Sequence, residues 1–220
     1  MPDRPGPAPS EVRAEIDRLA ARGVRRVLTG ALHHGEVGPF LDAGFVEHER
    51  LCLLRHDLLS LSDRPSAVAT RRAWRRDAPA VLDIDRRAFD AFWSLDRRGL
   101  DDAVRATPAS RFRVVADAHG AVTGYAVTGR AADRGYLQRL AVDPDHHRRG
   151  LGAALVGDSL RWLRRSGAHV AVVNTQEHNE GAFALYLASG FVPEPRGLTV
   201  LVCDLVATSP HGELPPSGHR

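Results

Sequence analysis

The fold of this chain is decided by the stretch Leu137-Gln-Arg-Leu-Ala-Val-Asp-Pro-Asp-His-His-Arg-Arg-Gly-Leu-Gly152, in which an apolar strand runs into a basic turn and then a helix. A helix start leaves several backbone N–H groups without intrahelical partners and carries the positive end of the helix dipole, so phosphate oxygens bind there without a dedicated side chain. Gly150 and Gly152 let the backbone approach a ligand closely, and Arg148 and Arg149 add permanent charge with a fork geometry suited to phosphate. We interpret the stretch as a pyrophosphate-binding site.

The spacing within this stretch excludes two common phosphate motifs. A Rossmann fingerprint has a third glycine three residues after the second, and Leu155 occupies that position. A P-loop needs Gly-Lys-Ser/Thr, and the sequence contains no lysine. The ligand therefore belongs to another class of phosphate-bearing molecule.

A second informative stretch is Asn179-Glu-Gly-Ala-Phe-Ala-Leu-Tyr-Leu-Ala-Ser-Gly-Phe191. Its apolar residues predict a helix that ends at Gly190. Spacings of three and four place several side chains on one face of this helix, namely Ala182, Leu185, Tyr186 and Ser189.

Together the two stretches resemble the acyl-CoA motifs of the GCN5-related N-acetyltransferase (GNAT) family. The first has the order strand, Val-Asp-Pro-x-x-x-Arg-Arg-Gly-x-Gly, helix, and the second matches the family at Asn179, Ala182, Leu185, Tyr186, Gly190 and Phe191. One position departs from the pattern, because the family usually has Gln or Arg three residues before the first glycine and this chain has His147. The resemblance covers about residues 66–206.

The resemblance implies a fold, a reaction and a cofactor. The fold is α/β, a mixed and mostly antiparallel twisted sheet flanked by helices. The reaction moves an acetyl group from acetyl-CoA, or another short acyl-CoA, to a primary amine on a small molecule or a peptide N-terminus. Residues implied to bind the cofactor are Leu140, Ala141, Val142, His147, Arg148, Arg149, Gly150, Leu151, Gly152, Ala153, Asn179 and Tyr186.

The resemblance also assigns chemical roles to individual side chains. Tyr186 is the implied general acid that protonates the departing CoA thiolate; the alternative is a tyrosine that only packs in the core. Asn179 is implied to contact the cofactor arm, and it can equally be the N-cap of the helix that follows it. Candidate acceptor-binding residues are Phe92, Trp93, Asp96, Gln138 and Asn174.

No single residue stands out as the general base. Tyr136, Gln138 and Asn174 occupy the region where many relatives carry a Glu, and none of them is a good base. The remaining candidates are a water chain, an amine that is already partly neutral, or one of the polar residues Glu177, His178, Asp90 and Asp96.

The N-terminal segment resembles half of the same domain. Gly23 and the strand after it correspond to Gly167 and its strand, and Gly44-Phe45 corresponds to Gly190-Phe191, with the offset growing only from 144 to 146. The alternative is coincidence between two amphipathic αβ units. This alignment places Phe40 opposite Tyr186 and lacks the basic Gly-x-Gly turn, so we expect this half to be inert toward CoA and to pack on the catalytic domain or shape its acceptor groove.

These observations predict a domain plan: a disordered tail over 1–9, a degenerate half-unit over 10–60, a linker over 61–66, a catalytic domain over 67–206 and a second disordered tail over 207–220. Periodicity predicts helices over 36–43 and 100–106 and helices beginning at Ser10, Asp77, Leu151 and Asn179. Predicted strands span 24–29, 49–58, 67–74, 111–116, 121–128, 135–142 and 169–174.

Composition narrows the remaining classes. The 220 residues carry a formal net charge of +3, and all 30 basic residues are arginine. We expect most of these arginines to be solvated, with no nucleic-acid partner. Cys52 and Cys203 lack metal-like spacing, so we expect no metal. No apolar run approaches the ~20 residues of a membrane helix, which indicates a cytoplasmic protein, monomeric or homodimeric.

Two functional classes remain open from the sequence. The first is a catalytic N-acyltransferase, and retention of Tyr186 favours it. The second is a non-catalytic module that binds acyl-CoA for regulation or interaction, which the missing Glu permits.

Overall fold

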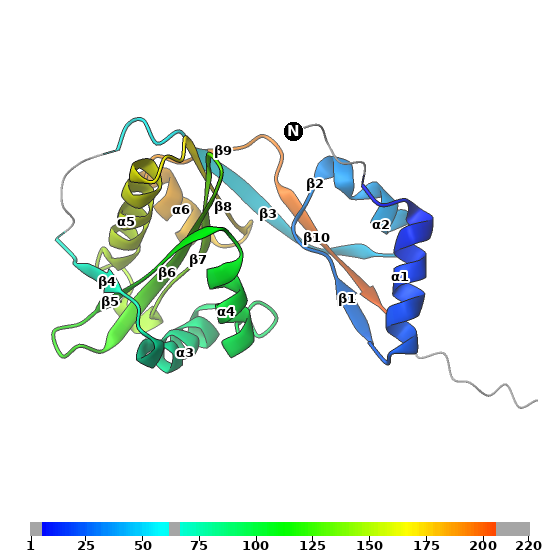
Figure 1. The fold of residues 1–220 in the computed structure, drawn as a ribbon, viewed down its shortest axis with the longest axis horizontal. Coiled ribbons are helices and arrows are strands. Elements are labelled where there is room, and N and C mark those ends of the chain that lie inside the picture. Colours follow the sequence, from blue (N-terminus) through cyan, green and yellow to red (C-terminus); the bar gives the residue numbers. More distant parts are fainter. Residues whose placement is uncertain (1–5, 62–66, 206–220) are drawn as a thin grey trace, which may run out of the picture. The chain divides into compact units, whose positions relative to one another are not determined.

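The structure is a computed structural model that describes residues 6–61 and 67–205 (Figure 1). The predicted C-terminal tail, most of the predicted linker and residues 1–5 of the predicted N-terminal tail lie outside these ranges. Within the described residues the chain forms two compact units, one drawn from residues 6–51 and 196–205 and the other from residues 52–61 and 67–195. The division falls inside one long strand, β3 (Val46–His56).

The first unit joins the N-terminal segment to the last strand of the described chain. Helix α1 (Pro9–Ala21) begins with a proline and ends before Gly23, whose φ is +80°. It is followed by β1 (Arg26–Leu28), β2 (Leu32–His33), a 3-10 turn η1 (His34–Glu36) and α2 (Gly38–Asp42). Strand β10 (Leu198–Asp204) pairs antiparallel with β1, β2 and β3. A small core of its own forms around Val12, Phe45 and Leu201.

The second unit contains an antiparallel run of four strands. These are β4 (Thr70–Arg72), β5 (Ala109–Ala116), β6 (Val122–Ala131) and β7 (Arg134–Val142). Strand β8 (Val170–Gln176) joins β7 in parallel, and β3 borders β8. The short β9 (Val192–Pro193) pairs with the end of β3. The sheet order in this unit is therefore β3-β8-β7-β6-β5-β4.

Helices cover both faces of the second unit's sheet (Figure 1). On one face α5 (Leu151–Arg165) and α6 (Glu180–Ala188) bury apolar side chains against β7 and β8. On the other face α3 (Ala78–Ala88) and α4 (Arg97–Arg105) pack against β5 and β6. Two 3-10 turns, η2 (Arg75–Asp77) and η3 (Pro144–His146), precede α3 and α5.

Two irregularities of β7 shape the centre of this unit. Val127 pairs with Arg139 and Thr128 pairs with Leu137, so Gln138 is an extra residue, a β-bulge. The parallel pairing of β7 with β8 ends at Tyr136 opposite Val172. This last rung lies two residues before the bulge, and beyond it the two strands separate.

The predicted fold class is confirmed: the sheet is mixed, mostly antiparallel and flanked by helices. The predicted helix over 36–43 is wrong in extent, because Glu36 ends a 3-10 turn and α2 has only five residues. The units also differ from the predicted ranges 10–60 and 67–206. The cause is strand pairing, since β10 joins the N-terminal strands and the end of β3 joins the second unit. In the described part of the chain no helix is long and apolar enough to cross a membrane.

Candidate active site

The turn before α5 exposes backbone N–H groups at a helix start. Arg148 and Gly150 both have positive φ, +59° and +77°, and Gly150 is the N-cap of α5. The first helical hydrogen bond runs from the Ala154 N–H to the Gly150 carbonyl, 3.0 Å. The N–H groups of Leu151 and the two residues after it therefore have no acceptor within the helix. Such an array of amides at the positive end of a helix binds anions.

The side chains of this turn are mostly tied to the protein's own backbone. The His147 ring lies with Nε2 3.0 Å from the Val142 carbonyl oxygen, so it fixes the turn to the end of β7. Arg149 donates to the Asp145 carbonyl at 3.2 Å. Arg148 is exposed and left available to an anionic ligand.

A salt-bridge cluster that the sequence did not reveal anchors the same turn. Arg87 of α3 pairs with Asp143, and its Nη1 donates to Asp145 at 3.1 Å. The Asp143 carboxylate also accepts from the Asp145 N–H at 3.0 Å. The two carboxylates lie within the motif, but Arg87 lies 56 residues away from Asp143 in the sequence. No local pattern indicated that this arginine would pair with them.

The two glycines of the turn have different roles. A β-carbon on Gly150 would meet nothing within 4 Å, so its requirement is the left-handed backbone. A β-carbon on Gly152 would lie 2.9 Å from Leu185 Cδ2, so this glycine lets α5 pack closely on α6. The predicted role of Gly152, close approach to a ligand, is thus accompanied by a helix-packing requirement.

The residues predicted to offer their backbone to the cofactor lie where β7 leaves β8. Leu140, Ala141 and Val142 all follow the last β7–β8 rung. They pair with β6 on one edge, and no rung to β8 is formed at these residues on the other. The N–H and C=O groups of this segment that face away from β6 are therefore available to a ligand that enters between the strands, except for the Val142 carbonyl, whose oxygen contacts His147 Nε2.

Tyr186 is buried in α6 on the same side as α5. It is 5 % exposed, and its ring meets Phe191 edge-on at a centroid distance of 5.6 Å. The ring belongs to the apolar cluster that contains Leu137 and Val173, the residues directly after the last β7–β8 rung. Burial raises the pKa of the Tyr186 phenol to about 12, so the group keeps its proton at every working pH.

Asn179 is the N-cap of α6 in this structure. Its Oδ1 accepts a hydrogen bond from the Ala182 N–H at 3.0 Å. The capping role that the sequence allowed is confirmed, while a contact with the cofactor arm stays a prediction.

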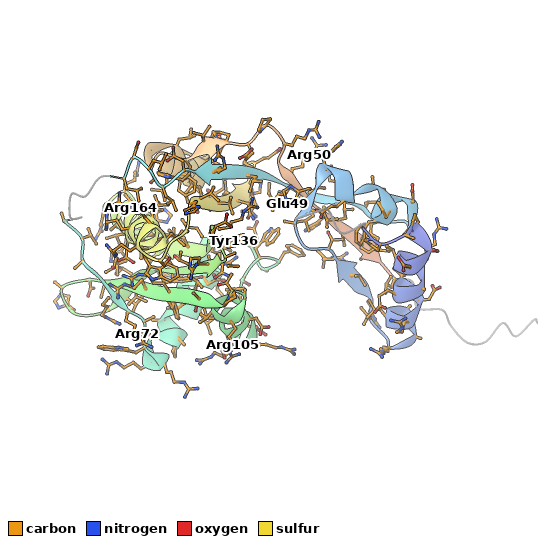
Figure 2. All side chains as sticks on the ribbon, turned by 45° about the horizontal axis from the view of Figure 1, so that its top comes forward. Glu49, Arg50, Arg72, Arg105, Tyr136 and Arg164 are labelled. Atoms are coloured by element: carbon orange, nitrogen blue, oxygen red, sulfur yellow. The ribbon has the colours of Figure 1, made fainter. Side chains whose placement is uncertain are left out.

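A cavity of about 420 Å³ opens between β7, β8 and the loop after α4. Its lining includes Gln138 and Asn174, two of the predicted acceptor-binding residues. The full lining is Leu53, Ala106, Thr107, Ala131, Tyr136, Leu137, Gln138, Val172, Val173 and Asn174. In Figure 2 Tyr136 lies in the interior of this unit, whereas Arg72 and Arg105 lie at its edge.

The other three predicted acceptor residues do not line this cavity. Asp96 is the N-cap of α4 and accepts from the Gly99 N–H at 2.7 Å. Phe92 is 42 % exposed and packs edge-on against Trp93. The Trp93 carbonyl accepts a hydrogen bond from Arg139 at 2.6 Å. The candidate bases Asp90, Glu177 and His178 are exposed and are also absent from the lining.

Arg139 belongs to a buried polar network that holds the loop before α4. Its guanidinium binds Asp85 through two hydrogen bonds of 2.8 and 2.9 Å. Asp85, which is fully buried, also accepts from the Tyr125 hydroxyl and from the Leu95 N–H. With all its partners in place this network is rigid, and it fixes the strand residue adjacent to the Gln138 bulge.

Comparison with known proteins identifies the family. The family model described as "Acetyltransferase (GNAT) family" matches residues 78–191, which contain the separated strands, the basic turn and Tyr186. The chain belongs to the GNAT acetyltransferase family. It is therefore an N-acetyltransferase by family, and GNAT enzymes use an acyl-CoA donor, generally acetyl-CoA.

Curated relatives of this GNAT protein are named acetyltransferases. The [Ribosomal protein bS18]-alanine N-acetyltransferase of Escherichia coli (strain K12) is 30 % identical over 115 residues, which is 52 % of this chain and 74 % of the relative. The mycothiol acetyltransferase of Salinispora arenicola (strain CNS-205) is 32 % identical over 207 residues, 83 % of this chain and 67 % of the relative.

A solved structure supports the same fold. A tandem GNAT protein from the clavulanic acid biosynthesis pathway superposes with a TM-score of 0.68 over 91 % of this chain and 70 % of its own, at 15 % identity. At that identity the likeness concerns the fold alone.

Proposed function

We propose that this protein transfers an acetyl group directly from acetyl-CoA to a primary amine on a small molecule or at a peptide N-terminus. The observation that carries the proposal is the separation of β7 from β8 after Tyr136 and Val172. The separation leaves an edge of free backbone groups, which leads toward the anion-binding start of α5.

Binding of the cofactor follows from three groups of residues. The N–H groups at the start of α5, together with Arg148 and Arg149, suit the pyrophosphate. The free strand edge at Leu140–Val142 suits the amide-bearing arm, because both sides can exchange N–H and C=O hydrogen bonds. When bound, acetyl-CoA supplies the activated thioester carbonyl.

Tyr186 is the proposed general acid. Its pKa of about 12 means that it always holds the proton it has to donate. A CoA thiol resembles a cysteine, with a pKa near ~8.5, so the phenol is the weaker acid by roughly 3.5 pKa units. Proton donation to sulfur is therefore best coupled to the loss of a proton by the acceptor nitrogen, so that no phenolate accumulates.

The N-terminal segment is proposed to be a degenerate half of a second GNAT domain. The Val24 N–H donates to Leu19 at 3.1 Å and the Ala168 N–H to Leu163 at 3.0 Å, at an offset of 144. Each bond closes a helix over a glycine with positive φ. The agreement supports a repeated helix ending.

The second helix ending of each half supports the same proposal. The Phe45 N–H donates to Phe40 at 3.0 Å and the Phe191 N–H to Tyr186 at 3.1 Å, at an offset of 146. The two ring pairs have centroid distances of 5.5 and 5.6 Å. Because this half lacks the basic Gly-x-Gly turn and has Phe40 in place of the tyrosine, we expect it to bind no CoA, so a titration should give one CoA site per chain.

The proposal is tested by CoA release in the presence of acetyl-CoA and a panel of amines. Wild-type protein should release thiol with at least one acceptor, and Tyr186→Phe should lower kcat by about 10²–10⁴-fold without abolishing CoA binding. The alternative is a non-catalytic acyl-CoA-binding module. Tight CoA binding without turnover on any amine would favour that module over an enzyme.

A further inference from the structure

The cavity beside the β7 bulge carries no ionisable acid or base suited to bind a charge. None of its ten lining residues is Asp, Glu, His or Arg. Its polar groups are the amides of Gln138 and Asn174 and the hydroxyls of Thr107 and Tyr136. Its volume of about 420 Å³ lies near the lower end of the ~300–1,000 Å³ typical of ligand pockets. Such a cavity suits a small, uncharged, hydrogen-bonding group.

The lining therefore selects the acceptor amine by its pKa. An ammonium ion that leaves water without a carboxylate partner is strongly disfavoured, so the amine has to enter uncharged. At pH 7.5 an α-amine with a pKa near ~8 is about one-quarter neutral, whereas a lysine-type ε-amine with a pKa near ~10.4 is only about 0.1 % neutral. The concentrations of the reactive, neutral amines therefore differ roughly 200-fold.

The same lining selects against a free carboxylate on the acceptor. A free amino acid carries its carboxylate carbon two bonds from the amine nitrogen. The ten lining residues include no arginine and no helix start with free backbone N–H groups that could bind this carboxylate. An amide in the same place is neutral and exchanges hydrogen bonds with the side-chain amides of Gln138 and Asn174.

Gln138 lines this cavity, and its side-chain amide can present an acceptor to a ligand when it turns toward the cavity. Its Oε1 is buried and has no hydrogen-bond partner among the described residues. An unsatisfied buried oxygen costs free energy that a bound N–H recovers. The bulge places this residue two positions past the last β7–β8 rung, beside the free edge proposed for the thioester arm.

We infer that the acceptor is an α-amino amide, that is, an aminoacyl group with a free α-amine, a small uncharged side chain and its carboxyl group in an amide bond. Gln138 is the positioning residue that accepts an N–H from it. The inference rests on the proposed function, because it names the substrate class of the same site. A peptide N-terminus and a small aminoacyl amide share this chemistry.

The test measures CoA release by the full chain with acetyl-CoA and five acceptors. These are alaninamide, a trialanine amide, free alanine, Nα-acetyl-lysinamide and spermidine. We expect kcat/KM for alaninamide or the peptide at pH 7.5 to exceed that of Nα-acetyl-lysinamide and spermidine by at least 100-fold. This ratio of kcat/KM values should fall as pH rises toward 10, because a growing fraction of the ε-amine loses its proton. Free alanine should react at least tenfold more slowly than alaninamide after each rate is divided by the neutral fraction of that amine.

A matched pair of variants tests Gln138 itself. Gln138→Glu introduces a carboxylate that can hold an ammonium, so the preference for alaninamide over Nα-acetyl-lysinamide should fall at least tenfold. Gln176→Glu makes the same chemical change outside the lining and should leave the preference unchanged. Because the preference is a ratio within one protein, partial loss of folded protein does not alter it.

The outcomes separate the inference from the proposed function. If Nα-acetyl-lysinamide, spermidine or free alanine is acetylated as fast as alaninamide and the peptide, or faster, at pH 7.5, the inference is overturned. The proposed acetyltransferase function still stands in that case. Unchanged selectivity in Gln138→Glu overturns the role of Gln138. Binding of acetyl-CoA without turnover of any of the five acceptors, nor of a wider amine panel, overturns both.

Discussion

The backbone of Gly129 lies against the side-chain amide of Gln138: a β-carbon at Gly129 would come 2.8 Å from both Cδ and Nε2 of that amide and would clash with Thr107 Oγ1. Gly129 sits on β6 beside the bulged strand. The absence of a side chain at this position therefore gives the Gln138 amide its place in the cavity.

Gly129→Ala should raise KM for the amine acceptor about tenfold and leave KM for acetyl-CoA near its wild-type value. The atoms in the way belong to side chains, so the fold can accommodate the methyl group by moving the Gln138 amide and turning Thr107 away from the Ala109 carbonyl, to which its hydroxyl donates. Steady-state kinetics with both substrates varied checks this, with thermal unfolding as a control for folding. An unchanged acceptor KM would show that the position of Gln138 is not important for binding.

Removing the arginine that anchors the basic turn should weaken cofactor binding. Arg87→Ala leaves Asp143 and Asp145 without their cation, so the turn loosens and negative charge lies uncompensated near the pyrophosphate site. We expect KM for acetyl-CoA to rise about five- to twentyfold, equivalent to about 1–2 kcal/mol.

The neighbouring arginine of α3 is a matched control for this variant. Among the residues that the structure describes, Arg86 pairs only with the exposed Asp83 on the same helix, at 2.7 Å, and exposed pairs of this kind contribute about 0–1 kcal/mol. Arg86→Ala should leave KM for acetyl-CoA unchanged. Equal effects of the two substitutions would mean that total charge, rather than the geometry of the turn, governs binding.

Two substitutions in the turn should separate backbone shape from side-chain chemistry. Gly150→Val should abolish measurable CoA binding in a calorimetric titration, because a β-branched residue is strongly disfavoured at a φ of +77°. His147→Arg should preserve or improve CoA affinity, since the added charge offsets the lost ring contact with the Val142 carbonyl. If the two variants bind CoA equally well, the pyrophosphate site lies elsewhere.

The buried phenol of Tyr186 should make the protein sensitive to alkali. Its folded-state pKa of about 12 lies above the ordinary value of 10.0, so the unfolded state loses the proton first as pH rises. The stability contribution is complete below pH 10 and is lost between pH 10 and 12, by up to about 3 kcal/mol.

Tyr186→Phe has no proton to lose at this position, so the variant should lose less stability than wild type across that pH window. Urea unfolding at pH 8, 10 and 11.5 measures the difference. If the difference in unfolding free energy between wild type and Tyr186→Phe stays the same from pH 8 to pH 11.5, the pKa of Tyr186 is not raised.

Local sequence patterns were sufficient to predict much of the second unit. The glycine-bearing turn, the long amphipathic α5 and the Asn179 to Phe191 helix each follow from residues close together in the chain, and the structure has them at the predicted places. The end of α1 at Gly23 follows in the same way.

Features that depend on contacts between distant segments could not be predicted in this way. The bulge at Gln138 is defined by the register of β7 with β6, and the sequence of neither strand alone indicates it. Arg87 looks like any other solvated arginine until the fold brings it to Asp143. Phe92 and Trp93 were chosen as large aromatics near the first helices, yet they pack on each other outside the cavity lining.

The pairing of β10 with β1, β2 and β3 has a consequence for the order in which the chain folds. The ribosome makes α1 and the strands of the first unit early, but the strand that completes their sheet, Leu198–Asp204, emerges after the whole of Cys52–Pro195. Until then β1 and β3 present unpaired backbone edges, a state that invites wrong strand partners. The strands made before residues 52–195 thus acquire their last partner only after those residues, and faster folding of the intervening unit shortens the time for which their edges stay unpaired.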